Sequence, residues 1–381
     1  MGFVGDDALI IPQITTVVIS LCLRGVLNYV RGCEKIMPTH IGSYTIAMDK
    51  APGFLGWAAV GSKKEAEGPI GQRFDMTSED ALFGQKSWEL GEGEMQKIAA
   101  SKALAKASLA PGDVGMLFAG DLLNQITASH YGLRELGIPF LGQYGACSTM
   151  SQGLILAAMM VEGGFAAKAM AVTSSHFCSA ERQYRFPLEY GGTRTPTAQW
   201  TATAAGAAIV GESLSPPFVR HVCIGSIENK DVKDLSNMGA AMAPAAALTL
   251  QRFFKDTCTG PDNYDVIFTG DLGVIGSRLL CQLMEREGYK LDGKHADCGL
   301  MLFDKDTQED INAGGSGCGC AAAVLCAYLL PNMRAGKINE ALFMATGALM
   351  SPVSVQQGQD IPGIAHLVHL STKQSGRPQG G

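Results

Sequence analysis

The pattern of apolar and polar residues predicts a helix, a turn and a buried strand, in that order along the chain. Residues 92–109 (EGEMQKIAASKALAKASL) carry strong helix formers with apolar residues at helical spacing. Pro111, Gly112 and Asp113 then end this helix, and the short apolar run VGMLFAG follows at 114–120. The pattern predicts an α/β unit whose strand is covered on both faces.

The same order returns in the second half of the chain. Residues 264–276 read YDVIFTGDLGVIG, and the FTGDL at 268–272 repeats the FAGDL at 118–122. Each copy follows a turn that contains Pro and Asp, and each leads into a helical Leu/Arg/Glu pattern, at 131–137 and at 277–288. A repeated motif in matching order predicts an internal duplication.

A second pair of segments extends the repeat. Residues 146–175 and 314–348 both contain a small-residue turn, an apolar helix, a glycine break and a strand. Two βαβαβ-like halves packed together predict an α/β fold with five layers, αβαβα. We place the first half at 41–217 and the second at 218–381, and set residues 1–40 apart as an N-terminal extension.

The composition argues against nucleic-acid binding, an electrostatic membrane patch and a zinc site. The chain has 381 residues, 46% of them apolar and 17% charged, and a net charge of −6. Lys and Arg do not cluster in the sequence, so no nucleic-acid partner is expected and no purely electrostatic membrane patch is indicated. The eleven cysteines include no CxxC pair, which favours a reducing compartment over disulfides or a zinc site.

The apolar stretch ALIIPQITTVVISLCL at residues 8–23 admits three interpretations. It is short for a membrane span, and Pro12 interrupts it. The stretch could belong to an extension from an early start site, with Met37 or Met48 as the alternative start, or form a peripheral or anchoring helix. A cleaved signal is the third interpretation, although acidic residues precede the stretch.

Cys147 lies in a sharp turn of small residues, LGQYGACSTMSQG at 141–153, just before an apolar helix. With the duplication, this arrangement resembles the thiolase-like superfamily, in which such a cysteine is the nucleophile. The resemblance implies histidine or asparagine partners from two loops of the second half, and in some members a second cysteine. The matching positions here are Thr269, the turn Gly315-Ser316-Gly317 and Thr346.

These replacements indicate that Cys147 is not an efficient nucleophile. A free thiol has a pKa of about 8.5 and needs a neighbouring cation, a base or a helix N-terminus to become reactive. Only the helix N-terminus remains here. Hydroxyl groups at Thr269, Ser316 and Thr346 can hold a ligand without attacking it.

Longer blocks carry a closer resemblance, over residues 54–370. Among them are GDLLNQITA, IPFLGQYGACSTM, TSSHFCSAERQYRFPLEYGG, AGGSGCGCAAA and SPVSVQQGQDIPGIAH, which resemble the stage V sporulation protein AD family. The resemblance implies a non-enzymatic component of the SpoVA system, peripheral at the inner spore membrane, that binds dipicolinic acid and works with the other SpoVA membrane proteins. No cofactor or resident metal is expected, and entry of calcium with the ligand and homodimer formation are left open.

Dipicolinate is a flat pyridine with two carboxylates, so its site needs a slot with hydrogen-bond donors. We predict that the emptied thiolase-like site holds it, between the turns at 145–149 and 314–319. The predicted ligand-binding residues are Cys147, Ser148, His176, Thr269, Gly315, Ser316, Thr346 and Asn124.

Other polar residues near these turns have a structural interpretation as well. His176 also fits a turn histidine, and Asn124 also fits a helix cap. Asp121 and Asp271 are expected to bond their own loops; Arg182, Arg185 and Arg194 are expected to form ion pairs or line an interface. Two other functions remain: an active acyltransferase that uses Cys147, and a structural protein of a membrane complex whose pocket is empty.

Overall fold

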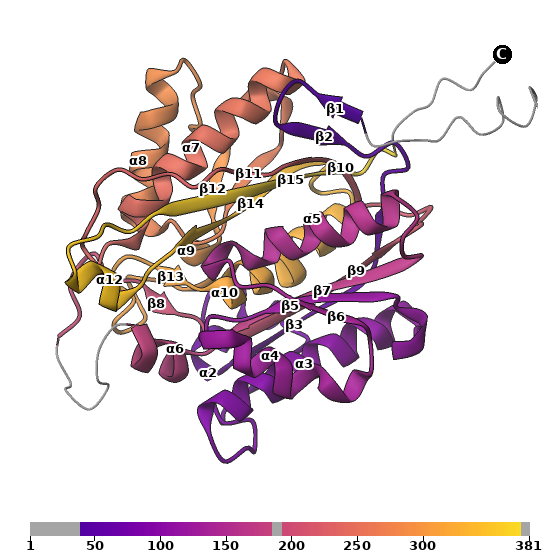
Figure 1. Ribbon diagram of the computed structural model, residues 1–381, viewed down its shortest axis with the longest axis horizontal. Helices are drawn as coiled ribbons and strands as arrows, with labels where there is room; N and C mark the ends of the chain where they lie inside the picture. Colours follow the sequence, from indigo (N-terminus) through magenta and orange to yellow (C-terminus); the bar gives the residue numbers. More distant parts are fainter. Residues whose placement is uncertain (1–38, 185–192, 375–381) are drawn as a thin grey trace, which may run out of the picture. The chain divides into compact units, whose positions relative to one another are not determined.

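Each half of the chain builds the same arrangement of five strands (Figure 1). The strand order is β3-β9-β7-β5-β6 in the first half and β10-β15-β14-β11-β12 in the second. The strand directions agree too: in each set the first three strands pair antiparallel and the last three pair parallel. The predicted duplication is therefore confirmed.

The computed structural model describes residues 39–184 and 193–374, so the apolar stretch at 8–23 lies outside the described residues. The repeated strands are β3 (Gly53–Ser62), β5 (Met116–Gly120), β6 (Phe140–Gly142), β7 (Lys168–Ser175), β9 (Ala204–Gly211), β10 (Phe218–Cys223), β11 (Val266–Thr269), β12 (His295–Asp297), β14 (Glu340–Ala348) and β15 (Gly363–Ser371). The main helices are α3 (Trp88–Ala107), α4 (Thr127–Leu133), α5 (Thr149–Glu162), α7 (Met238–Thr257), α8 (Gly273–Arg286), α10 (Cys318–Val324) and α11 (Leu330–Arg334).

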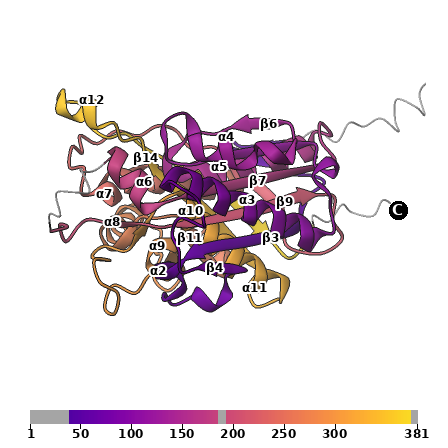
Figure 2. The ribbon, with the colours of Figure 1, turned by 90° about the horizontal axis from the view of Figure 1, so that it is seen from below.

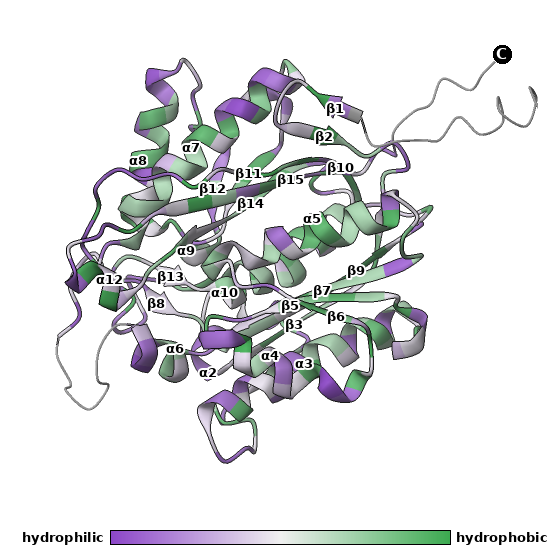
Figure 3. Ribbon diagram, in the orientation of Figure 1, coloured by the Kyte–Doolittle hydropathy of each residue, from purple (hydrophilic) through white to green (hydrophobic). Residues whose placement is uncertain are grey.

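The helices form three layers around the two sets of strands, as Figures 1 and 2 show. Helices α5 and α10 lie between the sheets and belong to the central apolar cluster, α3 packs on the first sheet, and α7 packs on the second. Figure 3 shows the difference between central and outer helices: α5 is apolar over most of its length, whereas α3 and α7 also carry hydrophilic residues. The five-layered αβαβα class is confirmed.

The first helix and strand lie within a few residues of the predicted ranges, since α3 spans Trp88–Ala107 rather than 92–109 and β5 spans Met116–Gly120 rather than 114–120. Ser87 caps α3 through its Oγ, which accepts a hydrogen bond from the backbone N–H of Leu90, and Pro111 follows the helix. The motif FAGDL ends β5 and FTGDL ends β11, so Asp121 and Asp271 follow equivalent strands at the same end of the two sheets. Ligands in α/β folds bind at the carboxyl ends of parallel strands.

The boundaries at 41, 217 and 218 stay a prediction. The hairpin of β1 (Thr39–Ile41) and β2 (Thr45–Ala47) precedes the first half in the sequence, but β2 pairs with β10 of the second sheet. The remaining elements are α2 (Lys63–Ala66), β4 (Met76–Ser78), α6 (Phe177–Tyr184), β8 (Trp200–Thr201), α9 (Cys298–Leu302), β13 (Gly315–Ser316) and α12 (Pro352–Gln356).

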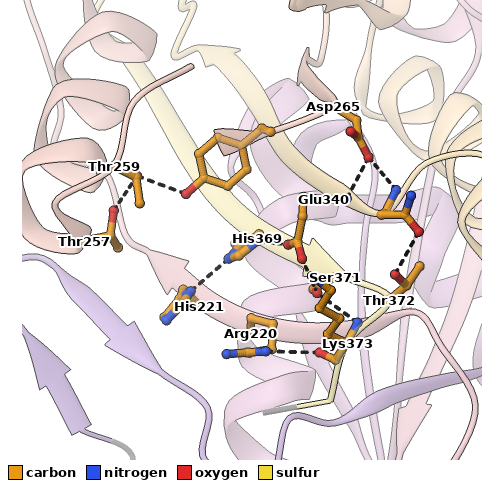
Figure 4. A network of polar contacts seen from close by, with 12 residues as sticks. Arg220, His221, Thr257, Thr259, Asp265, Glu340, His369, Ser371, Thr372 and Lys373 are labelled. Carbon is orange, nitrogen blue, oxygen red and sulfur yellow. Dashed lines mark hydrogen bonds and ion pairs between the residues drawn. The ribbon is translucent and has the colours of Figure 1, made fainter. Parts of the chain in front are cut away.

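A polar network crosses the second sheet between β10, β15 and β14 (Figure 4). The Nδ1 atoms of His221 and His369 are 2.8 Å apart, and Nε2 of His369 is 2.9 Å from the Glu340 carboxylate. Burial lowers the pKa of His221 to about 4, so this ring is neutral at physiological pH. The network ties three strands together through side chains as well as through the backbone.

Candidate ligand pocket

A cavity of about 210 Å³ lies at the carboxyl ends of the parallel strands. Its lining comes from both halves of the duplication. The lining residues are Leu122, Tyr144, Ala146, Cys147, Ala180, Tyr184, Thr201, Met238, Ser316, Ala348, Leu349 and Met350. Within the described part of the chain, neither a histidine nor a charged side chain lines this cavity.

Cys147 reaches the cavity because the chain turns sharply just before α5. Ala146 has φ = 51°, a left-handed conformation that is uncommon for a residue with a Cβ and that recurs at functional sites. The Cys147 side chain is only 5% exposed, and its Sγ is 4.0 Å from Oγ of Ser316. The two turns that were predicted to face each other therefore meet at this pair.

A buried carboxylate, Asp271, organises the floor beneath the thiol. It accepts hydrogen bonds from the Gly317 N–H (3.0 Å), the Ser316 hydroxyl (3.3 Å) and the Thr346 hydroxyl (2.9 Å). Burial raises the pKa of Asp271 above its usual range. A carboxyl group thus stands beside Cys147, where a reactive thiolate would be stabilised by a neighbouring cation.

The surroundings disfavour the thiolate of Cys147. Its pKa is raised well above the ordinary value, first because the thiol is buried and then because Asp271 lies beside it. A thiolate is the reactive form of cysteine, so a raised pKa means low reactivity at neutral pH. Hydrogen bonds with the Ser316 hydroxyl and the Gly317 N–H lower the thiol pKa but do not offset these two effects.

Of the three positions that replace catalytic partners, the structure brings two together. Ser316 and Thr346 share the carboxylate of Asp271. Of the three residues, Ser316 lines the cavity, whereas Thr269 and Thr346 lie outside its lining. The Thr269 hydroxyl donates to Asp297 (2.7 Å) and is 2.8 Å from Nε2 of His295. Sequence spacing missed this histidine, which strand pairing between β11 and β12 brings to Thr269. Burial lowers the pKa of His295 to about 4, so it is neutral.

Gly315 does not face the cavity. A Cβ built on Gly315 would approach the Phe303 ring at 2.8 Å and would be 3.2 Å from Gly299. In a Gly315→Val variant the added methyl groups would therefore press into a packed core rather than fill the cavity.

Three other predicted ligand-binding residues are outside the cavity lining. Ser148 is buried, and its hydroxyl donates to the Gly145 carbonyl at 2.7 Å. His176 is buried with Nε2 2.9 Å from the Ala81 carbonyl, which is the arrangement of a turn histidine. The Oδ1 of Asn124 accepts a hydrogen bond from the lining residue Tyr144 at 3.0 Å, but Asn124 does not itself line the cavity.

The structural interpretation holds for Asp121 and the described arginines but is wrong for Asp271, whose carboxylate bonds Ser316, Gly317 and Thr346 rather than its own loop. Asp121 bonds its own loop, accepting hydrogen bonds from the Leu123 N–H and from the N–H and hydroxyl of Ser129. Arg182 pairs with Glu89. Arg194 pairs with Glu181, and Arg185, the third arginine considered above, lies outside the described residues.

Two tyrosines at the cavity were missed by sequence reasoning. The hydroxyls of Tyr144 and Tyr184 are 2.5 Å apart, Tyr144 also donates to Asn124, and Tyr184 donates to the Leu122 carbonyl at 2.5 Å. Two hydroxyl protons thus serve three contacts, since each phenol has one. The two hydroxyl groups therefore form a full hydrogen bond with each other only when one of them releases its other acceptor, Asn124 or the Leu122 carbonyl. A signal was available for Tyr144, which lies three residues before Cys147.

A buried pair of acids, Glu92 and Asp121, lies behind the cavity wall. Glu92 accepts hydrogen bonds from the hydroxyls of Ser174 and Ser179, both at 2.9 Å. Burial, and then the charge of Asp121, raise the pKa of Glu92 to about 8. Glu92 therefore keeps a proton in the folded protein at neutral pH, whereas a glutamate in the unfolded chain loses it near pH 4.3.

We expect Glu92→Gln to flatten the pH dependence of stability. Unfolding releases the Glu92 proton between the unfolded and folded pKa values, so this group makes wild-type stability fall as pH rises from about 4.3 towards 8. The slope reaches about 1.4 kcal/mol per pH unit. Melting temperatures at pH 6, 7 and 8 measure it, and Glu94→Gln, on the same helix, should leave the slope unchanged. Equal slopes in wild type and Glu92→Gln would contradict the assignment.

The duplicated sheets, with a cysteine at the start of a buried helix, have the arrangement of the thiolase-like fold. The structure resembles 3-oxoacyl-[acyl-carrier-protein] synthase III from Aquifex aeolicus VF5, with a TM-score of 0.51 and 12% identity over 84% of this chain and 99% of that chain. It also resembles OleA from Xanthomonas campestris, with a TM-score of 0.54 and 14% identity over 84% and 98% of the two chains. At these identities the likeness shows the fold alone.

The sequence comparisons are more specific. Residues 42–371 match the family model of stage V sporulation protein AD (SpoVAD). The chain is 43% identical over 305 residues to stage V sporulation protein AD of Bacillus subtilis (strain 168), which covers 80% of this chain and 90% of that protein. The chain belongs to the stage V sporulation protein AD family, a family of sporulation proteins.

Neither a membrane-spanning helix nor a metal-ligand group is found in the described ranges. In residues 39–184 and 193–374, no helix has both the length and the apolar character needed to cross a bilayer. The same ranges contain no group of three or more His, Cys, Asp or Glu side chains arranged to hold a metal ion.

Proposed function

We propose that this chain is a non-catalytic component of the SpoVA system that binds dipicolinic acid in the Cys147 cavity. In this role it takes part in the uptake of calcium dipicolinate into the developing spore. It acts at the inner spore membrane as a peripheral protein, together with the other SpoVA membrane proteins. The observation that carries the proposal is a preserved thiolase-like cavity whose cysteine faces an acid and hydroxyl groups.

The size and lining of the cavity suit a single substituted ring. An apolar cavity of about 150 Å³ can hold benzene, so about 210 Å³ leaves room for small substituents. Met238, Leu349 and Met350 offer apolar surface to the faces of a ring. Hydroxyl groups of Tyr144 and Ser316 also line the cavity. Each has one proton, so it donates to a ligand carboxylate only by releasing its present acceptor, Asn124 or Asp271.

Charge is the harder requirement, because dipicolinate is a dianion. The N-terminus of α5 points towards the cavity from Thr149, and a helix N-terminus favours anions. The raised pKa of Asp271 keeps that group protonated to a higher pH than usual, which reduces the negative charge that the ligand meets. A dianion paired with calcium would enter with less charge still, so calcium is included in the test.

The test is calorimetric titration of the full chain with dipicolinate, with and without calcium. Isophthalate is the matched control ligand, since it has the same two carboxylates without the ring nitrogen. We expect saturable dipicolinate binding at one site per chain and weaker binding of isophthalate. Absence of dipicolinate binding under both conditions would remove the proposal.

The competing function is an acyltransferase that uses Cys147, as the fold of its enzyme neighbours allows. Incubation with acyl-CoA followed by mass spectrometry distinguishes the two. We expect no acylated Cys147, and we expect Cys147→Ala to change dipicolinate affinity by less than about threefold, because only a small buried side chain is lost. Rapid labelling of Cys147 without dipicolinate binding would favour the enzyme.

A further inference from the structure

Two strongly exposed apolar side chains lie on neighbouring loops at the end of the molecule opposite the cavity. Leu214 is 92% exposed and Phe165 is 74% exposed, more than any other large apolar side chain in the described residues. Phe165 is on the loop before β7, and Leu214 is on the loop after β9. Lys168 of β7 pairs with Gly211 of β9, so the two loops are neighbours.

Three basic side chains lie beside these two loops. The Nζ of Lys50 donates to the carbonyl of Glu162, three residues before Phe165. A Cβ on Gly211 would lie 3.3 Å from the Lys168 side chain. Arg334 donates to the Pro216 carbonyl, two residues after Leu214, and to the Phe54 carbonyl at 2.9 Å.

We call the surface formed by Phe165, Leu214, Lys50, Lys168 and Arg334 the loop face. Further cations flank it, since Arg220 of β10 donates to the Lys373 carbonyl at 3.1 Å (Figure 4). The exposed acids on the same loops are Asp49 and Glu212. This concentration of cations is notable in a chain with a net charge of −6, because the remaining surface must carry the excess of negative charge.

Exposed apolar side chains beside cations form the pattern of a surface that meets lipid.

We propose that the loop face docks on a bilayer that contains anionic lipids. Phe165 and Leu214 enter the headgroup region, and Lys50, Lys168 and Arg334 pair with lipid phosphates while their stems contribute apolar contact. The negative charge elsewhere on the molecule keeps the opposite end away from the same membrane. This assignment gives a face to the membrane association proposed above and does not depend on what the cavity binds.

The orientation has a consequence for the cavity. In Figures 1 and 2, α6 and α12 lie at the left, beside the cavity, and the ends of α5 and β9 that carry the loop face lie at the right. A protein docked through the loop face therefore presents the cavity to the aqueous side, where it can take up ligand while it is bound to lipid.

The test is co-sedimentation of the full chain with vesicles of phosphatidylglycerol and phosphatidylcholine, beside vesicles of phosphatidylcholine alone. We expect binding to the anionic vesicles that weakens with salt. The double variant Phe165→Ser/Leu214→Ser should partition at least about tenfold less. The double variant Lys50→Ala/Lys168→Ala should lose about tenfold on anionic vesicles only.

The matched control is Ile227→Ser/Val353→Ser, which removes two side chains, each 63% exposed, from elsewhere on the surface. It should bind vesicles as wild type does. Wild-type binding by Phe165→Ser/Leu214→Ser, equal loss in the control, or no vesicle binding by wild type would overturn the proposal. Loss of a dimer in the Phe165→Ser/Leu214→Ser variant without lipid would also overturn it, because the loop face would then join two copies. Dipicolinate titration of the same variants keeps this test separate from the proposed function.

Discussion

The variant Ala180→Phe should lose dipicolinate binding by at least about 100-fold, or about 2.7 kcal/mol of binding free energy. Ala180 is buried in α6, and its methyl group lines the cavity. A phenyl ring in that place occupies most of the 210 Å³, since about 150 Å³ is enough to hold benzene. The measurement is the calorimetric titration used for wild type.

The matched control for Ala180→Phe is Ala105→Phe. Ala105 is exposed on α3, so the same substitution adds an aromatic ring without entering the cavity. We expect wild-type affinity from this variant. Extra volume in a packed region costs about 1–3 kcal/mol of stability, so the melting temperature of Ala180→Phe is measured beside binding. Wild-type affinity in a folded Ala180→Phe protein would place the ligand outside this cavity.

The variant Asp271→Ala should be strongly destabilised, by about 3–5 kcal/mol. Its carboxylate accepts hydrogen bonds from Ser316, Gly317 and Thr346, all at the centre of the fold. Removal leaves these donors buried without their acceptor. The measurement is the melting temperature, which should fall by about 6–10 °C in a domain of this size.

Two further variants separate this explanation from a general effect of losing an aspartate. Asp271→Asn keeps the shape and one acceptor oxygen, so its melting temperature should lie between those of wild type and Asp271→Ala. Asp80→Ala removes an exposed carboxylate that accepts from the Leu82 and Gly84 N–H groups in a surface turn, and it should cost little. A similar fall for Asp80→Ala and Asp271→Ala would mean that the buried network does not stabilise the site.

Much of the architecture was predictable because its signals are local. The repeated F-x-G-D-L motif marks the ends of β5 and β11, and continuous apolar strands between helices indicate covered sheets. The turn around Cys147 was readable for the same reason, since small residues before an apolar helix have few other structures open to them. The absence of histidine at Thr269 and Thr346 was visible in the sequence itself.

The content of the cavity was not predictable to the same degree. Successive side chains of a strand point to opposite faces, and the direction of each depends on register with a partner that is distant in the sequence. Thr269 therefore bonds to Asp297 of β12, whereas Thr346 points to Asp271. Gly315 meets Phe303 rather than the cavity.

The sequence by itself determined the duplication, the fold class, the place of Cys147 and the family. Periodicity and short motifs are sufficient for these, because they depend on neighbours along the chain. The tertiary structure alone decided that Asp271 lies beneath the thiol, that Tyr184 and Met238 join the cavity, and that Lys50, Lys168 and Arg334 share one face. Residues more than a hundred positions apart come together only through strand pairing and layer packing, and no local pattern records those contacts.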